Sequence, residues 1–289
     1  SQFLKYPVIY SIQGLMKEMS KKYPMNINYW FMSKIENYIL KKNKYFISQS
    51  KYVTQYIQKQ TKNKIIFETY YAVNSVFFLK EKASNIENNI IFLGSINDKN
   101  KGFNILLKSF IKIIKNGYNY NLIVIGGGDP FKSKYKKIIN EYNIQGYIKY
   151  LGYLSQEKIA EVFSYSKILV VPSFIESYSM TVAEGLSSGL CVIASNTTGI
   201  NSLITNNYNG ILFETGNSDD LFEKILLVIS NDILHFSFVL QKATIENNEI
   251  SSFNGLKKIG IDDPLKFFNE SIPKIEELKS EPFVFNNYT

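Results

Sequence analysis

The sequence predicts an α/β protein with parallel β-sheets in two units, the first of them incomplete. Short apolar segments alternate with helix-patterned segments, which is typical of a parallel sheet covered by helices on both faces. Six strand segments fall within residues 90–230, enough for a doubly wound domain, but only about three fall within residues 1–89. The length of 289 residues is sufficient for two domains.

The first unit is expected to contain short buried strands separated by helices. Apolar runs and helical spacing predict strands at residues 7–12, 45–48 and 64–68, and helices at residues 29–42 and 51–60. A polar segment, residues 85–89, then predicts a linker.

The second unit is expected to alternate strand and helix more regularly. Predicted strands are residues 90–93, 121–125, 148–151, 168–171, 191–194 and 210–213, and predicted helices are residues 103–116, 132–142, 156–164, 181–188 and 218–230. In an open parallel sheet, ligands bind outside the carboxyl ends of the strands. Glycine, serine and proline cluster at those ends, which is the layout of a nucleotide site.

The composition excludes several classes of protein. With 20% charged and 45% hydrophobic residues, the chain is neither disordered nor collagen-like. The single cysteine, Cys191, excludes a disulfide framework and a cysteine metal cluster. We find neither an apolar run of membrane-spanning length nor the pattern of a signal peptide, so we expect a cytoplasmic protein.

The positive charge is concentrated in the first third of the chain. The formal net charge is +8, and residues 1–90 alone contribute +9, from 14 Lys and 5 acidic residues. This asymmetry predicts contact with an anionic membrane surface or a charged acceptor, although a solvated basic surface explains it equally well. All 33 basic residues are Lys, which argues against nucleic-acid binding, where Arg is favoured.

Residues 172–185 carry the strongest chemical pattern. Glu176 leaves the end of a strand, and Glu184 follows eight residues later inside the next helix. Ser179 and Met180 fall at the expected helix start, where free amides and the positive end of the helix bind a diphosphate. One carboxylate can then accept hydrogen bonds from ribose hydroxyls, and the other from hydroxyls of a sugar.

This stretch resembles the E-x7-E motif of the family-4 retaining glycosyltransferases, also called glycosyl transferases group 1, which have the GT-B fold of two Rossmann-like domains. Gly94 with Lys101-Gly102 is similar to that family's glycine loop and K-G pair, and the resemblance is continuous from about residue 90 to 232. We therefore expect a partial acceptor-side domain at residues 1–89, a nucleotide-sugar donor domain at residues 90–232, and a tail without an assigned role at residues 233–289.

The resemblance implies a retaining hexosyltransferase that moves a sugar from a UDP- or GDP-sugar to a glycan or lipid-linked acceptor, in surface polysaccharide synthesis. It implies no metal and no other cofactor. The single cysteine fits a cytoplasmic location, and the basic first third of the chain predicts that this location is peripheral on the inner membrane face. Its implied catalytic residues are Glu176 and Lys101, its donor-binding residues are Gly94, Ser95, Lys101, Ser179, Met180 and Glu184, and its acceptor-side residue is Gln13.

Departures from the family pattern, together with only about three strands before residue 90, leave alternatives open. The family usually has Arg where Ser95 stands, and His often stands at the position of Gln13. A truncated, non-catalytic nucleotide-sugar binder or inactive fragment is therefore the second hypothesis. A GT-B epimerase acting on a UDP-sugar is the third, because it would share the donor site and need no acceptor.

Overall fold

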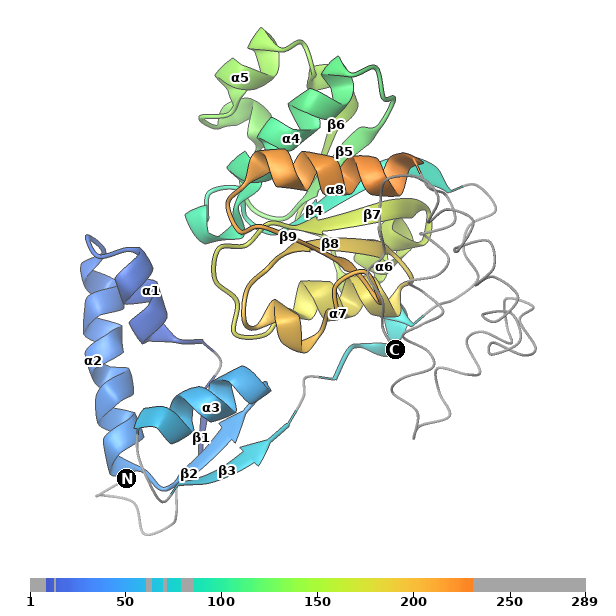
Figure 1. Ribbon diagram of the computed structural model, residues 1–289. Helices are drawn as coiled ribbons and strands as arrows, with labels where there is room; N and C mark the ends of the chain where they lie inside the picture. Colours follow the sequence, from blue (N-terminus) through green and yellow to red (C-terminus); the bar gives the residue numbers. More distant parts are fainter. Residues whose placement is uncertain (1–8, 13, 61–63, 70–71, 79–85, 231–289) are drawn as a thin grey trace, which may run out of the picture.

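The computed structural model describes residues 9–12, 14–60, 64–69, 72–78 and 86–230, which form two α/β units (Figure 1). Each unit is built on a parallel sheet, so the predicted α/β class and the two-unit organisation of its sheets are confirmed. None of the helices within these ranges combines the length and the apolar character that a bilayer crossing needs.

The first unit has a sheet of three parallel strands in the order β1-β2-β3. Its small core joins the sheet to α2 and α3 through Leu40, Phe46, Val53 and Ile57. Its elements are β1 (Ile9–Ile12), α1 (Met16–Lys22), α2 (Ile27–Lys42), β2 (Tyr45–Ser48), α3 (Lys51–Gln60) and β3 (Ile65–Glu68).

The second unit has six parallel strands in the order β6-β5-β4-β7-β8-β9. The chain therefore winds outward from β4 in one direction and from β7 in the other, as in doubly wound nucleotide-binding folds. Its strands are β4 (Glu87–Leu93), β5 (Asn121–Ile125), β6 (Ile148–Gly152), β7 (Ser166–Val171), β8 (Cys191–Ser195) and β9 (Ile211–Phe213).

Helices cover both faces of this sheet because successive side chains of a strand point to opposite faces. Ile90 and Phe92 of β4 join a core with α4, α5 and α8, whereas Ile91 joins a second core with α6 and α7. Figure 1 shows α4, α5 and α8 above the sheet and α7 below it. The helices are α4 (Phe103–Lys115), α5 (Lys136–Glu141), α6 (Gln156–Ser164), α7 (Met180–Ser187) and α8 (Ser218–Ser230); short 3-10 turns are η1 (Ser75–Phe77), η2 (Lys99–Lys101), η3 (Pro130–Lys132), η4 (Gln145–Tyr147) and η5 (Ile200–Ser202).

Two sequence-based expectations for the second unit were wrong. The expected linker at residues 85–89 is partly strand, because β4 already begins at Glu87, and the buried Asn89 side chain bonds to Glu87 and Asn121. The helix expected at residues 132–142 is instead η3 followed by α5. Ser133 interrupts it, because its hydroxyl donates to the Pro130 carbonyl and accepts from the Tyr135 N–H, which closes a local turn.

The crossover between the units packs against the second unit. Phe77 of η1 is buried beside Phe163, with ring centroids 5.8 Å apart, and the Ser188 hydroxyl donates to the Phe77 carbonyl at 3.0 Å. These contacts fasten residues 73–77 to the α6–α7 face of the sheet. The expected domain boundaries at residues 89/90 and 232/233 stay predictions.

Candidate functional site

The predicted site residues of the second unit lie where the strand order reverses, between β4 and β7. Gly94 and Ser95 follow β4, and the loop from Pro172 to Glu176 follows β7. The connections after these two neighbouring strands leave toward opposite faces, and this is the place at which open α/β sheets bind ligands. The structure thus brings together two segments that are about eighty residues apart in the chain.

Glycine turns let the loops at this edge approach one another closely. The Gly94 N–H donates to the Ile125 carbonyl at 2.9 Å, and the Gly126 N–H donates to the Gly152 carbonyl at 2.7 Å. A Cβ atom on Gly126 would lie 2.4 Å from the Gly94 carbonyl oxygen, and its φ of +119° favours glycine. The backbone at Gly94 and Ser95 is therefore held in place by the neighbouring strand end.

Asn100, which the sequence analysis did not single out, fastens η2 to the loop after β7. Its side chain donates to the Ile175 carbonyl at 2.9 Å and accepts from the Ile175 N–H at 3.0 Å. Its carbonyl accepts from the Phe174 N–H at 2.8 Å. The residue is buried, so these three bonds are shielded from water and fix the positions of the neighbouring Lys101 and Glu176.

Lys101 and Glu176, the two expected catalytic residues, form an ion pair with 2.9 Å between Nζ and Oε1. The Lys101 side chain is 35% exposed and that of Glu176 12% exposed, so the pair faces solvent on one side. A pair with this exposure contributes about 1 kcal/mol or less to stability. Both groups can therefore exchange this contact for the phosphate and hydroxyl groups of a ligand at little cost.

The first turn of α7 supplies free backbone donors beside this pair. Ser179 is the N-cap residue, and its hydroxyl accepts from the Val182 N–H at 3.4 Å. The N–H groups of Met180 and Thr181 precede the first residue that can bond to a carbonyl within the helix. Ser179 and Met180 thus lie where the sequence analysis expected them, at an end that attracts anions.

Glu184 lies one helical turn beyond Met180, on the same face of α7, because residues four apart are neighbours on a helix. Only 9% of the residue is exposed, and burial raises the pKa of its carboxyl to about 7. Among the described residues, no hydrogen-bond or ion-pair partner of this carboxyl is found. A ligand with two adjacent hydroxyl groups would supply the missing donors.

Glycines also allow α7 and the loop before it to pack closely against their neighbours. A Cβ atom on Gly185 would lie 2.3 Å from Cδ2 of Leu169, so α7 presses directly on β7. A Cβ atom on Gly199 would lie 2.1 Å from the Glu176 carbonyl oxygen, so the segment after β8 supports the loop that carries Glu176. A larger residue at position 199 would displace the backbone at Glu176, whereas at position 185 it would first displace the side-chain end of Leu169.

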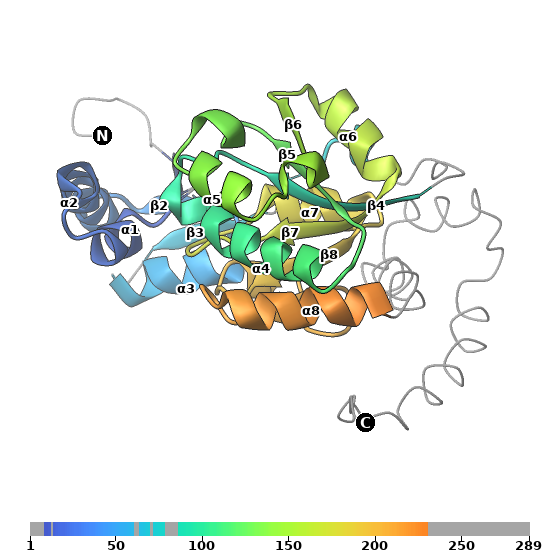
Figure 2. The ribbon, with the colours of Figure 1, turned by 90° about the horizontal axis from the view of Figure 1, so that it is seen from above.

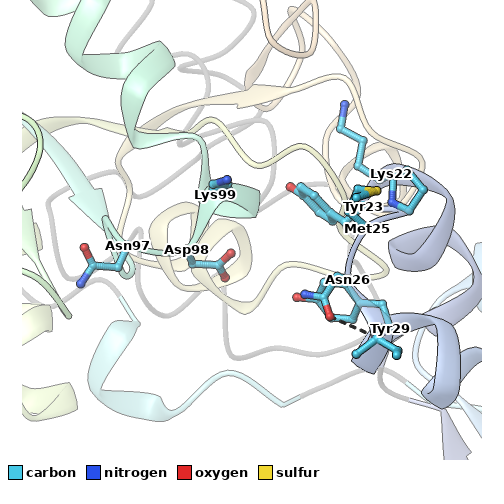
Figure 3. Close-up of a pocket in the computed structure, with 10 residues that line it drawn as sticks. Lys22, Tyr23, Met25, Asn26, Tyr29, Asn97, Asp98 and Lys99 are labelled. Carbon is cyan, nitrogen blue, oxygen red and sulfur yellow. Dashed lines mark hydrogen bonds between the residues drawn. The ribbon is translucent and has the colours of Figure 1, made fainter.

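The first unit touches this loop, and together with residues 97–99 it borders an open cavity. The Ser50 hydroxyl donates to the Ser177 carbonyl at 2.8 Å, and Lys22 Nζ lies 4.6 Å from the centroid of the Phe174 ring. The cavity, of about 710 Å³, lies between the α1–α2 turn and η2 (Figure 3). Its lining residues are Lys22, Tyr23, Pro24, Met25, Asn26, Ile27, Tyr29, Asn97, Asp98 and Lys99.

The lining of this cavity mixes aromatic rings with amide, carboxylate and ammonium groups. Tyr23 of the first unit and Asp98 of the second both line it, and burial, and then the Asp98 charge, raise the pKa of Tyr23. Tyrosine rings and polar side chains together suit a ligand rich in hydroxyl groups. The sequence analysis missed this cavity, and Gln13, its expected acceptor-side residue, lies outside the described residues.

The amino-acid sequence of this chain is similar to that of known glycosyltransferases. A profile of the glycosyl transferases group 1 family matches residues 77–249. An uncharacterized glycosyltransferase of Methanocaldococcus jannaschii is 31% identical over 188 residues, which are 65% of this chain and 50% of that protein. The chain thus spans about half the length of this curated relative.

A second relative is the N,N'-diacetylbacillosaminyl-diphospho-undecaprenol α-1,3-N-acetylgalactosaminyltransferase of Campylobacter jejuni. It is 29% identical over 123 residues, which are 43% of this chain and 31% of that protein. A stretch of 76 residues, 26% of this chain, is also 46% identical to the type II methyltransferase M.FokI of Planomicrobium okeanokoites. That stretch covers only 11% of the methyltransferase and gives no information on activity.

Solved structures share the arrangement of both units. Sucrose-phosphate synthase from Thermosynechococcus elongatus matches 96% of this chain with a TM-score of 0.70 at 16% identity, over 69% of its own length. Anabaena HepE, solved with UDP and glucose, matches 96% of this chain with a TM-score of 0.65 at 15% identity, over 72% of its own length. At these identities the likeness shows the fold alone, and it confirms the expected GT-B fold with an incomplete first domain. With the family profile covering more than half of its residues, the chain belongs to the glycosyl transferases group 1 family.

Proposed function

We propose that this chain transfers a sugar from a UDP- or GDP-sugar to a glycan or lipid-linked acceptor, with retention of configuration, in surface polysaccharide synthesis. The observation that carries the proposal is the Lys101–Glu176 ion pair at the reversal of strand order, beside the free amides of α7 and the buried Glu184. These groups have the charge and the hydrogen-bonding capacity that the diphosphate, the sugar and the ribose of such a donor require.

Each group has a defined task in the proposed transfer. Breaking the bond between the anomeric carbon and the diphosphate leaves negative charge on the diphosphate, which Lys101 and the Met180 amide would stabilise. The Gly94 and Ser95 backbone would lie against the phosphates. Glu184 would accept hydrogen bonds from the ribose hydroxyls, and Glu176 from hydroxyls of the donor sugar.

We propose that this transfer needs no metal ion. One ammonium group and the positive end of α7 supply the positive charge that a bound cation supplies in other sites. Chelation with EDTA is therefore expected to leave the initial rate unchanged. A rate that falls on chelation and returns on adding Mg²⁺ or Mn²⁺ would contradict this part of the proposal.

The cavity between the units is the proposed acceptor site. It opens next to η2, which carries Lys101, and its tyrosine and amide side chains suit sugar hydroxyls. The names of two relatives support a lipid-linked acceptor, since the C. jejuni enzyme and a galactosyltransferase of Escherichia coli are both named for undecaprenol diphosphate sugars. We accordingly propose a cytoplasmic location at the inner membrane face.

The test is transfer from radiolabelled UDP- and GDP-sugars to undecaprenyl diphosphate-linked sugars, with the anomeric configuration of the product read by NMR. We expect one donor to react with retention, and Glu176→Gln to slow the reaction at least about 100-fold. Glu161→Gln, the same change at an exposed position of α6, is the matched control. Donor binding without transfer would favour the non-catalytic binder, and a changed donor sugar without acceptor would favour an epimerase.

A further inference from the structure

The outward face of α2 is apolar. In a helix on the surface of a globular protein the apolar side normally faces the core, with polar residues outside. In α2 the buried positions include Ser33 and Glu36, whereas large apolar side chains face outward. Five of these exposed side chains recur at spacings of three and four residues along one side of the helix and are hereafter the α2 face: Ile27, Trp30, Phe31, Ile35 and Tyr38. The exposed Met32 falls outside this side of the helix, and the exposed Lys34 falls within it.

Most of the helix that carries this face lies at the edge of the first unit, and Ile27 at its start lines the cavity opposite residues 97–99. In both Figure 1 and Figure 2, α2 forms the outer edge of the first unit. Trp30, Phe31 and Tyr38 are 55%, 58% and 60% exposed. Large apolar side chains that are exposed together on one side of a helix mark an interaction surface.

The charge around the α2 face is positive, because the acidic groups nearby are turned inward. Of the two acidic residues between positions 14 and 44, Glu36 accepts from the Tyr56 hydroxyl at 2.5 Å and from the Met16 N–H at 2.6 Å. The other, Glu18, accepts from the Tyr52 hydroxyl. The same stretch carries seven lysines, which are Lys17, Lys21, Lys22, Lys34, Lys41, Lys42 and Lys44.

We propose that the α2 face docks on the surface of an anionic lipid bilayer. Trp and Tyr rings favour the headgroup region, and lysine ammonium groups lie at the level of the lipid phosphates while their stems cover apolar surface. A second copy of this chain is a poorer occupant, because a symmetric contact would place two lysine-rich surfaces against each other. For the transfer proposed above, docking brings the side of the cavity lined by Met25 and Ile27 toward the lipid.

The chain carries its own probe for this contact, because Trp30 is its only tryptophan. The full chain is titrated with vesicles of equimolar phosphatidylglycerol and phosphatidylcholine, and separately with vesicles of phosphatidylcholine alone. We expect the anionic vesicles to shift the Trp30 emission to shorter wavelength, and brominated lipid chains to quench it. The zwitterionic vesicles should bind at least about 100-fold more weakly, because several lysines each favour an anionic surface by about fivefold.

Two variants that retain Trp30 separate the apolar from the electrostatic contribution. Phe31→Ser combined with Ile35→Ser should lower the partition coefficient by at least about tenfold, because both exposed side chains lose their apolar contact with the lipid. Lys34→Gln, Lys41→Gln and Lys42→Gln together should lower it on the order of 100-fold. The matched control changes three exposed lysines near α5, Lys134, Lys136 and Lys137, to Gln and should bind nearly as tightly as the parent chain.

Three results would overturn the proposal. Trp30 emission that does not respond to anionic vesicles would exclude the contact, and equal binding to zwitterionic vesicles would exclude the role of charge. A lipid-free dimer that dissociates in the Phe31→Ser and Ile35→Ser variant would assign the face to a second copy. The assay uses neither nucleotide nor sugar, so its outcome does not depend on the proposed transfer reaction.

Discussion

Replacing Glu184 by Gln should stabilise the protein at alkaline pH and at the same time weaken its binding of a nucleotide diphosphate. Burial raises the pKa of this carboxyl from 4.5 to about 7. A group whose pKa is higher in the folded than in the unfolded chain binds protons on folding. Its contribution to stability is therefore fully present below the unfolded pKa and is lost as pH rises through the folded pKa. Gln carries no charge and has no such dependence.

The structure sets the size of this effect. At about 1.4 kcal/mol per pKa unit, the raised pKa of Glu184 corresponds to a loss of at most about 3 kcal/mol between about pH 4 and pH 8. The residue is buried, so little of this loss is screened by solvent. For a chain of this size, the corresponding difference in melting temperature is at most about 10 °C.

The assay is thermal unfolding of the parent chain and of Glu184→Gln at about pH 5 and about pH 8. Relative to the parent chain, the variant should have a higher melting temperature at about pH 8 than it has at about pH 5. Glu141→Gln, at an exposed position, is the control and should show no such change. An identical difference at both pH values would refute the reasoning about burial. Unchanged UDP or GDP affinity in Glu184→Gln would refute the proposed role in binding ribose.

Three further predictions concern the residues that hold the site. Asn100→Ala removes both side-chain hydrogen bonds to Ile175. It should weaken donor binding at least about tenfold, measured by calorimetry, and lower the free energy of unfolding by about 2 kcal/mol, measured by urea unfolding. Gly102→Ala should lower the free energy of unfolding by more than about 2 kcal/mol, because φ is +67° and the new Cβ would lie 1.9 Å from a backbone oxygen. The control Gly117→Ala, at φ +82° with nothing within 4 Å of the new Cβ, should lower it by about 1 kcal/mol. Equal losses in the two variants would show that the close contact at Gly102 is unimportant. Tyr23→Ala should raise the KM for the acceptor and leave that for the nucleotide sugar unchanged, and the reverse result would move the acceptor away from the cavity.

Much of the second unit could be predicted from the sequence because its local patterns agree with the final fold. The buried strands are short apolar runs, and most end in residues that permit sharp turns, such as Gly94 and Gly152. The start of α7 follows from Ser179, whose hydroxyl is a good N-cap. The prediction of a linker was wrong at Glu87–Asn89, because polar side chains there form hydrogen bonds within the sheet and pairing with a distant strand decides the structure.

The site could be predicted only in part. Glu176, Glu184 and Lys101 follow from a motif, and the structure places Lys101 against Glu176. The Asn100 contacts connect residues 75 positions apart, and the cavity is formed by two separate units, so no local pattern indicates either. The helix α1 was also missed, because Leu15 at its start offers no side-chain cap and the helix buries no residue fully.

The central claim is that a nucleotide diphosphate binds at the reversal of strand order, beside Lys101 and α7. Its most direct test is calorimetric titration of the full chain with UDP and GDP, repeated with Lys101→Met and with Lys112→Met, which removes a lysine that pairs with Asp219 outside the site. We predict that one nucleotide binds, that Lys101→Met weakens it by about 10- to 100-fold, and that Lys112→Met leaves it unchanged. Absence of binding by either nucleotide, or equal affinity in the parent chain and Lys101→Met, would contradict the claim.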